Sequence, residues 1–138
     1  MTPPLALEFE VLGPPKPWQR AGRGVARNGR VVSYTPPETV AYQRAVRTAA
    51  WAKLVTAGVH GWPLDARYRV KIACYFANDR RRDIDNLSKS VLDALAATKK
   101  NLTGALYADD TQVVELSVLK LLDREHPRTL VRVEVVQP

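Results

Sequence analysis

Hydrophobic and polar residues alternate over residues 5–11 and 68–76. Successive side chains of a β-strand point to opposite faces, so this period of two predicts strands that bury one face. The segment 68–76 has an aromatic and aliphatic face opposite a basic one, and we expect it to lie inside a sheet. The apolar segments 112–121 and 130–136 predict two further strands.

Apolar residues recur at helical spacing in two other segments. The buried stripe of the first consists of Tyr42, Val46, Ala50 and Leu54. Thr35-Pro36-Pro37-Glu38 has the form of a capping box at the start of this helix, and Gly58 is a suitable stop. The second helix follows a polar turn at residues 79–85, and its stripe consists of Leu87, Val91, Ala94, Leu95 and Thr98.

These elements occur in the order β, loop, α, β, α, β, β. A chain of 138 residues has the size of one domain. The sequence therefore predicts a single α+β domain over residues 1–138, with one mixed β-sheet and two main helices packed on it.

Residues 13–30 follow neither period. Their four glycines and three prolines resist regular structure and predict a mobile loop, although residues 30–34 are compatible with a short strand. Between Val11 and Pro37 the chain has five basic residues and no acidic one. We expect phosphate contacts from Lys16, Arg20, Arg23, Arg27 and Arg30. Trp18 can stack on an exposed base or pack beneath its own loop.

The whole chain has 21 Lys and Arg against 14 Asp and Glu, and its formal net charge of +7 favours polyanionic partners. No run approaches the roughly 18 apolar residues of a membrane helix, and the N-terminus lacks a signal-peptide pattern, so we expect a cytoplasmic protein without membrane association. Cys74 is the only cysteine and there are two histidines. This excludes a cysteine-based zinc site within the chain and leaves carboxylates as metal ligands.

Six of the 14 acidic residues fall between Asp79 and Asp110. Asp83 and Asp85 are two residues apart, so in an extended chain they point the same way and can hold one cation. Lys89 follows Asp85 by one helical turn, which would bring its ammonium close to a phosphate on that cation. Asp110 can add a third carboxylate, and such oxygen ligands suit Mg²⁺ or Mn²⁺.

Each of these features also has an ordinary structural interpretation. An Asp-x-Asp before a helix is often a turn plus an N-cap, and a single lysine on a helix is usually solvated. Arg80 to Arg82 can be a solubilising run of charge, and Asp109-Asp110 can simply start a strand. Spacing alone therefore does not define a reaction.

Three blocks around these residues resemble the RusA-type Holliday junction resolvases, a family of small homodimeric endonucleases of bacteria and prophages. The blocks are Arg82-Asp83-Ile84-Asp85-Asn86-Leu87 followed by Lys89, then Leu92-Asp93-Ala94-Leu95, then Asp109-Asp110-Thr111-Gln112-Val113. Gly13-Pro14-Pro15 with the basic loop, and the helix containing Ala41-Tyr42, match more loosely. The resemblance covers nearly the whole chain.

The resemblance implies that Asp83, Asp85 and Asp110 are the ligands of a catalytic Mg²⁺, with Mn²⁺ as a substitute, and that Lys89 is the catalytic lysine. The connection at residues 97–108 is longer than the family's usual one, which leaves the orientation of Asp110 open. Asp93 and Asp109 remain undecided between structural residues and ligands.

We therefore expect a Mg²⁺-dependent endonuclease that resolves four-way DNA junctions by paired nicks in recombination and repair. Arg81 and Arg82 join the expected DNA contacts. A homodimer matches the two-fold symmetry of a junction, and the segments 113–121 and 130–136 offer apolar interface material, although they can equally be buried within one subunit.

Two alternatives stay open: a metal-dependent nuclease of flaps or forks, and a non-catalytic basic module that binds nucleic acid. The acidic cluster argues against the second, because carboxylates repel phosphate unless a cation bridges them. The preference for branched junctions comes from the resemblance alone.

Overall fold

The computed structural model describes residues 5–19, 22–34, 36–59, 61–98 and 103–136. Within these ranges the chain forms two α-helices, one 3₁₀ helix and six strands. In chain order the elements are β1 (Ala6–Leu12), β2 (Gly22–Val25), β3 (Val31–Tyr34), α1 (Pro37–Thr56), β4 (Arg67–Phe76), α2 (Ile84–Leu95), the 3₁₀ helix η1 (Asp110–Gln112), β5 (Val113–Leu122) and β6 (Arg128–Val136).

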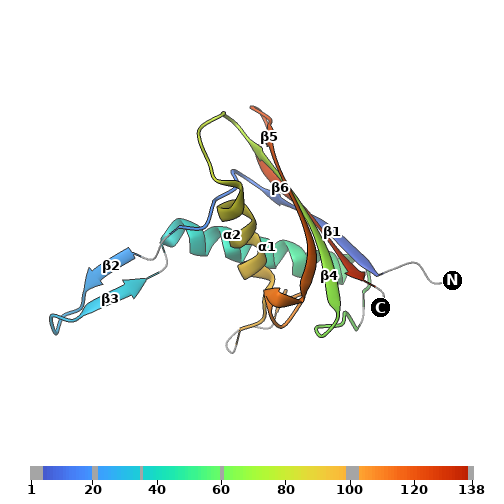
Figure 1. Ribbon diagram of the computed structural model, residues 1–138, viewed down its shortest axis with the longest axis horizontal. Coiled ribbons are helices and arrows are strands. Elements are labelled where there is room, and N and C mark those ends of the chain that lie inside the picture. Colours follow the sequence, from blue (N-terminus) through green and yellow to red (C-terminus); the bar gives the residue numbers. More distant parts are fainter. Residues whose placement is uncertain (1–4, 20–21, 35, 60, 99–102, 137–138) are drawn as a thin grey trace.

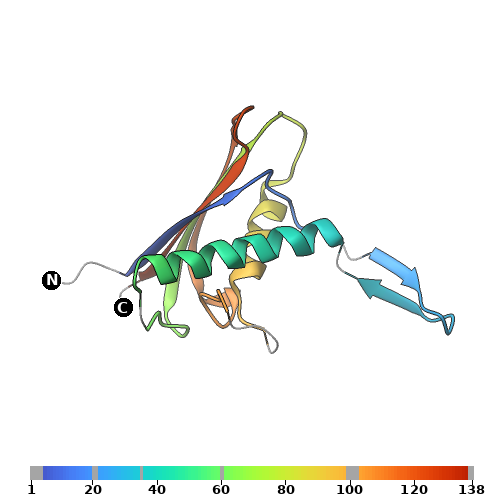
Figure 2. The ribbon, with the colours of Figure 1, turned by 180° about the vertical axis from the view of Figure 1, so that it is seen from behind.

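Four strands form the main sheet, in the order β1-β6-β4-β5. β6 is antiparallel to β1 and β4, whereas β4 and β5 are parallel, so the sheet is mixed. A parallel pair needs a crossover connection, which α2 provides. Figures 1 and 2 show from opposite sides that α1 and α2 both lie on one face of this sheet. The expected α+β domain with two packed helices is confirmed.

The core lies between the inner face of the sheet and the two helices. In β4, which is an interior strand as predicted, every second side chain from Tyr68 to Phe76 is buried. The predicted stripe of α1 is buried too, and Gly58 follows the end of this helix with a φ of 64°. Within the described ranges, no helix combines the length and apolar character that crossing a membrane requires.

The start of α1 differs from the predicted capping box. Thr35 lies outside the described residues. The N-cap position is Pro36, and no side-chain hydrogen bond caps the helix there. Pro37 at the first helical position has no N–H that needs a partner, so α1 begins on a proline without a capping side chain.

The segment predicted as an irregular loop contains a hairpin. β2 and β3 pair antiparallel, so the short strand expected at residues 30–34 is confirmed and β2 is an addition. In the turn, Gly29 has a φ of 82° and the Asn28 side chain accepts a hydrogen bond from the Arg30 backbone N–H at 3.1 Å. Asn28-Gly29 is a hairpin signal that the glycine-rich composition hides. This hairpin, residues 22–34, is called the arm below, and it stands away from the body in both ribbon views (Figures 1 and 2).

The longer connection between α2 and β5 is anchored to the helix on its C-terminal side. Leu106 donates its N–H to the Leu95 carbonyl at 2.9 Å. Tyr107 is fully buried, and its hydroxyl donates to the Leu92 carbonyl at 2.6 Å. The chain therefore reaches residues 109–110 from a fixed position beside α2.

Gly104 is the tightest point of this connection and supports a stability prediction. Its φ is +80°, and a Cβ added there would overlap the Arg47 carbonyl group of α1. We expect Gly104→Ala to lower the free energy of unfolding by about 2–4 kcal/mol, because backbone strain and overpacking add. Gly58 also has a positive φ, but an added Cβ there would meet open space. We therefore expect Gly58→Ala to lower the free energy of unfolding by only about 1 kcal/mol. Equal losses in urea denaturation would show that the contact with Arg47 is unimportant.

Candidate active site on helix α2

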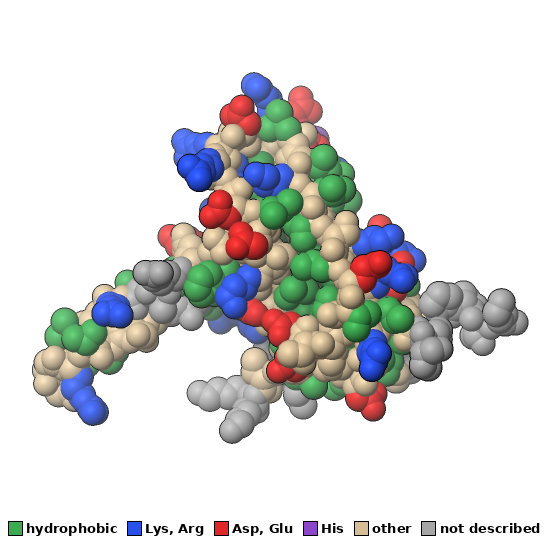
Figure 3. Space-filling model, viewed as in Figure 1, with side chains coloured by type: hydrophobic (Ala, Val, Ile, Leu, Met, Phe, Trp, Pro, Cys, Tyr) green, Lys and Arg blue, Asp and Glu red, His purple; other side chains and the backbone are tan. Residues whose placement is uncertain are grey.

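The exposed side of α2 carries a stripe of charge. Asp85, Lys89 and Asp93 are each four residues apart, which puts them on one side of the helix. The apolar residues of the opposite side, Leu87, Val91, Ala94 and Leu95, are buried in the core. Figure 3 shows acidic and basic side chains gathered over α2 in the middle of the face. Because the apolar side is fixed by packing, the charged side has to face outward.

The first two predicted ligands lie at the N-terminal end of α2. Asp83 occupies the N-cap position with an extended backbone (φ −82°, ψ 128°), and Asp85 lies in the first turn. No side-chain hydrogen bond caps the helix, so neither carboxylate acts as a cap. Both residues are exposed, and their oxygens are accessible to a ligand from solvent.

Lys89 is held between an acid and an aromatic ring. Its Nζ lies 3.5 Å from Oδ2 of Asp93, one helical turn further along α2. On another side, the same Nζ lies 5.0 Å from the ring centroid of Trp18. Trp18 is half-buried, and its ring contacts Lys89 of α2.

Asp109 has a structural role. Its carboxylate accepts a hydrogen bond from the Thr111 backbone N–H at 2.9 Å, and the Gln112 side chain accepts one from the Asp109 backbone N–H. Together these contacts form a capping box for η1. The hydrogen bond from Thr111 holds the pKa of Asp109 below its ordinary value. A carboxylate committed to a cap is a weaker candidate ligand, which separates Asp109 from its neighbour.

Asp110 lies near enough to α2 to be affected electrostatically by two residues of the charged stripe. Its pKa is raised above the ordinary value, first by partial loss of water contact, then by hydrogen bonding to and repulsion from Asp109, and then by repulsion from Asp93. Lys89 acts in the opposite direction and lowers this pKa. Both α2 residues are thus electrostatic neighbours of Asp110, as the crossover from α2 to β5 requires.

The described residues do not form a ready group of three metal ligands. Within the described part of the chain, no three His, Cys, Asp or Glu side chains lie close enough together to hold a metal ion. The charged residues that act on Asp110 are Asp109, Asp93 and Lys89. The donor chemistry nevertheless fits a hard divalent cation, because the candidates are all carboxylates and a cation relieves the repulsion that raises the pKa of Asp110.

The basic residues near the site divide into two kinds. Arg81 is exposed, whereas the Arg82 guanidinium lies 4.0 Å from the Phe76 ring centroid. The Arg82 guanidinium also donates to the Asn78 side chain at 2.9 Å and to the Arg80 carbonyl at 3.0 Å. Arg82 thus organises the turn that leads to Asp83.

Lys120 on β5 is a neighbour of the acidic block that the sequence reasoning missed. Its Nζ donates to the Arg82 carbonyl at 2.8 Å, immediately before Asp83. A lysine between leucines in the second half of a mostly apolar strand is the signal that could have identified it.

On the arm, the side chains of Arg23, Arg27 and Arg30 are exposed, as is Lys16 before it. Arg20 lies outside the described residues. Figure 3 shows Lys and Arg but no acidic side chains along the arm.

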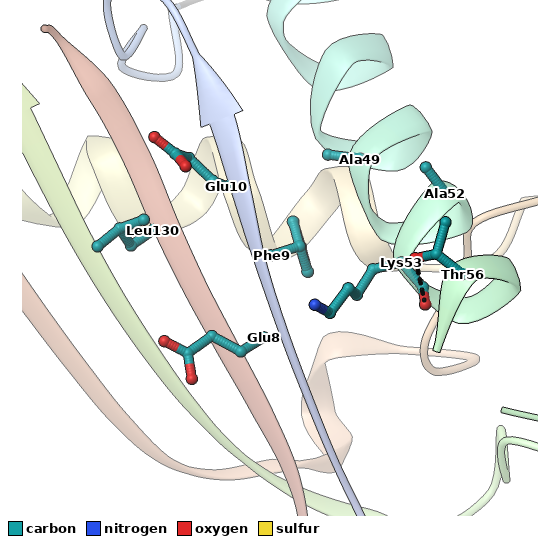
Figure 4. A pocket seen from close by; sticks show the side chains of 8 residues that line it. All are labelled: Glu8, Phe9, Glu10, Ala49, Ala52, Lys53, Thr56 and Leu130. Atoms are coloured by element: carbon teal, nitrogen blue, oxygen red, sulfur yellow. Dashed lines mark hydrogen bonds between the residues drawn. The ribbon is translucent and has the colours of Figure 1, made fainter. Parts of the chain in front are cut away.

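A groove of about 540 Å³ lies elsewhere, between α1 and β1. Figure 4 shows its lining, which is Glu8, Phe9, Glu10, Ala49, Ala52, Lys53, Thr56 and Leu130. It contains none of the predicted site residues, so the site is an open charged face rather than this groove.

The charges around Asp110 predict that two substitutions shift its pKa in opposite directions. Asp93→Asn removes a negative neighbour, so the pKa of Asp110 should fall; Lys89→Met removes a positive one, so it should rise. Titration of the Asp110 side-chain carboxyl by ¹³C NMR in metal-free buffer measures both. Glu125→Gln, beyond the opposite end of β5, is the control and should leave the titration unchanged. Shifts of the same sign in both variants would contradict the arrangement.

Comparison with known proteins identifies the family of the chain. The family model of endodeoxyribonuclease RusA matches residues 13–134. The chain is 29% identical over 105 residues to the crossover junction endodeoxyribonuclease RusA of Escherichia coli strain K12, covering 76% of this chain and 78% of that protein. Proteins of the same name from Enterobacteria phage 82 and Shigella sonnei strain Ss046 give the same identity and coverage. The resemblance in the sequence is therefore confirmed, and this chain belongs to the RusA family of endodeoxyribonucleases.

Proposed function

We propose that this chain is a Mg²⁺-dependent endonuclease that resolves four-way DNA junctions by paired nicks, in recombination and repair. The observation that carries the proposal is an exposed Lys89 that lies 3.5 Å from Asp93 and acts electrostatically on Asp110, in a member of this family. Relatives named crossover junction endodeoxyribonucleases support the junction as substrate. We expect the protein to act in the cytoplasm, where bacterial and phage DNA recombine.

The charges on this face support the metal requirement. A phosphodiester is anionic, and Asp83, Asp85, Asp93 and Asp110 would repel it. Lys89 does not by itself balance these carboxylates. A chain with a net charge of +7 that gathers acids at one place is suited to binding a divalent cation there and DNA around it.

The proposed roles follow from position and chemistry. Asp83, Asp85 and Asp110 would hold Mg²⁺, or Mn²⁺ in its place. When bound, the cation supplies positive charge to the phosphate and activates a water molecule for attack. Lys89, with 47% of its side chain exposed, donates to the phosphate and stabilises the negative charge that develops on it.

The arm and its neighbours would hold the DNA backbone. Exposed cations on an element that projects from the body can follow a strand without disturbing the core. The proposed contacts are Lys16, Arg20, Arg23, Arg27, Arg30 and Arg81. For Arg82 we propose the organising role described above, because its guanidinium is already engaged.

A two-fold homodimer is part of the proposal, because a four-way junction needs two opposed nicks and each chain offers one site. Of the two apolar segments considered for the interface, β6 lies inside the sheet and β5 at its edge. The exposed apolar residues of β5 are Val114, Leu116, Leu119, Leu121 and Leu122. This edge is where a second copy would bury the most apolar surface.

The carboxylates are tested by removing their charge. Asp83→Asn, Asp85→Asn and Asp110→Asn should each lower junction nicking by at least about a hundredfold, since each loses a metal ligand, while junction binding is kept or strengthened. The assay compares a synthetic four-way junction, a fork and linear duplex, with Mg²⁺ or with a chelator. Wild-type nicking without divalent cations would exclude the metal mechanism.

Glu125→Gln is a matched control that removes one remote carboxylate and should cut normally. If forks are cut faster than junctions, the protein is the alternative, a nuclease of flaps or forks.

The homodimer is tested by mixing chains. Mixing wild-type with Asp83→Asn chains should yield assemblies that nick one strand only. Paired nicks by a protein that sediments as a 15.4 kDa monomer would rule out the dimer.

The arm is tested through salt dependence. Replacing Arg23, Arg27 and Arg30 by alanine should weaken junction binding and reduce the slope of log affinity against log salt by about 0.9 per lost duplex contact. The control variant replaces Lys53, Lys71 and Arg124, which removes the same charge away from the arm. Equal slope changes in both variants would mean that only net charge matters.

A further inference from the structure

The chain enters the arm through a root, residues 18–19, that contacts both helices. Trp18 donates its backbone N–H to the Asn86 carbonyl in the first turn of α2 at 2.8 Å. The Thr39 hydroxyl in the first turns of α1 donates to Oε1 of Gln19 at 3.2 Å, and Thr39 is only 1% exposed. The root is thus fixed to the body, whereas the arm beyond it projects away (Figure 2).

The indole of Trp18 also contacts the site. The separation of 5.0 Å between Lys89 Nζ and the ring centroid lies within the range of a cation–π interaction. Asp93 contacts the same ammonium at 3.5 Å. Since about half of the Lys89 side chain stays exposed, the ammonium is held by two groups and remains open to a substrate.

The two partners of Lys89 differ in what they do when a phosphate arrives. Asp93 competes with the phosphate, because both anions attract the same positive charge. An aromatic face attracts a cation through its quadrupole and leaves the ammonium's charge and N–H donors available. A lysine side chain is long and mobile, so a partner that does not compete is needed to keep it in place.

We propose that Trp18 is a positioning residue for Lys89, which holds the ammonium toward the reacting phosphate and ties its position to the root of the arm. This inference rests on the proposed function, since it takes Lys89 as the group that meets the phosphate. It assigns Trp18 neither of the roles considered from the sequence. Trp18 then has two roles. Its backbone N–H anchors the root of the arm to α2, and its side chain positions Lys89.

The contact itself is tested without cleavage. In protein labelled with 5-fluorotryptophan, the three tryptophans should give three ¹⁹F resonances, and the loss of one in Trp18→Phe assigns Trp18. Lys89→Met should shift that resonance and leave those of Trp51 and Trp62 in place. An unshifted Trp18 resonance would overturn the inference while leaving the proposed nuclease function standing.

The positioning role is tested by kinetics. Trp18→Ala should lower kcat for junction nicking about three- to tenfold, as expected for the loss of one cation–π contact, with junction affinity in metal-free buffer changed less than about twofold. Trp18→Phe keeps a ring face and should recover most of the rate. In the Lys89→Met background, Trp18→Ala should cause no further loss, because the two side chains then act as one unit.

Trp51→Ala is the control, since Trp51 is 49% exposed on α1 and has no assigned role in the site. It should match the wild type in kcat and in junction affinity. Additive losses from Trp18→Ala and Lys89→Met, or a loss of affinity instead of kcat, would show that Trp18 acts independently of Lys89. If the wild type cuts no DNA, the proposed function fails first, and the fluorine spectra still report whether the contact exists.

Discussion

Burial of the apolar side of α2 is the interaction on which the candidate site depends. Leu87 and Val91 are fully buried in the core, and each such side chain contributes about 1.5–3 kcal/mol. An exposed ion pair such as Lys89 with Asp93 contributes about 0–1 kcal/mol. Packing therefore fixes the rotation of α2 about its axis, and the charged stripe is exposed to solvent as a result. Its residues do not have to attract one another to share a face.

The crossover between β4 and β5 then brings a second part of the chain to that face. Because these strands are parallel, the chain must return along the helix before β5 begins. The buried Tyr107 fixes the end of this return path against α2. Asp110 follows directly, so its closeness to α2 is a result of strand direction and of one buried tyrosine.

Much of the fold could be predicted because each long strand or helix repeats its hydrophobic residues with a single, constant spacing. The alternation in β4 and the four-residue spacing in α1 each match what is buried. β2 was harder, since its residues are too few and too rich in glycine to show a period. A hairpin there depends on one turn, at Asn28 and Gly29.

The candidate site residues could be named from the sequence, but their arrangement in space could not be predicted. Resemblance pointed to the acidic blocks, yet nothing in the spacing distinguishes Asp109 from Asp110. That distinction comes from a short 3₁₀ helix, which commits Asp109 as its cap, whereas Asp110 is an electrostatic neighbour of Asp93 and Lys89. Likewise, Trp18 and Lys89 are far apart in the chain, and only the docking of the root on α2 brings them together.

The arm has a different relation to the rest of the molecule. None of its described residues, 22–34, belongs to the hydrophobic core, and the hydrogen bonds that anchor its root are made by residues outside it. Changes in its length or charge therefore leave the folding equilibrium almost untouched. Evolution can revise how this protein holds a nucleic acid by altering one peripheral hairpin, while selection for thermodynamic stability acts on a separate set of positions.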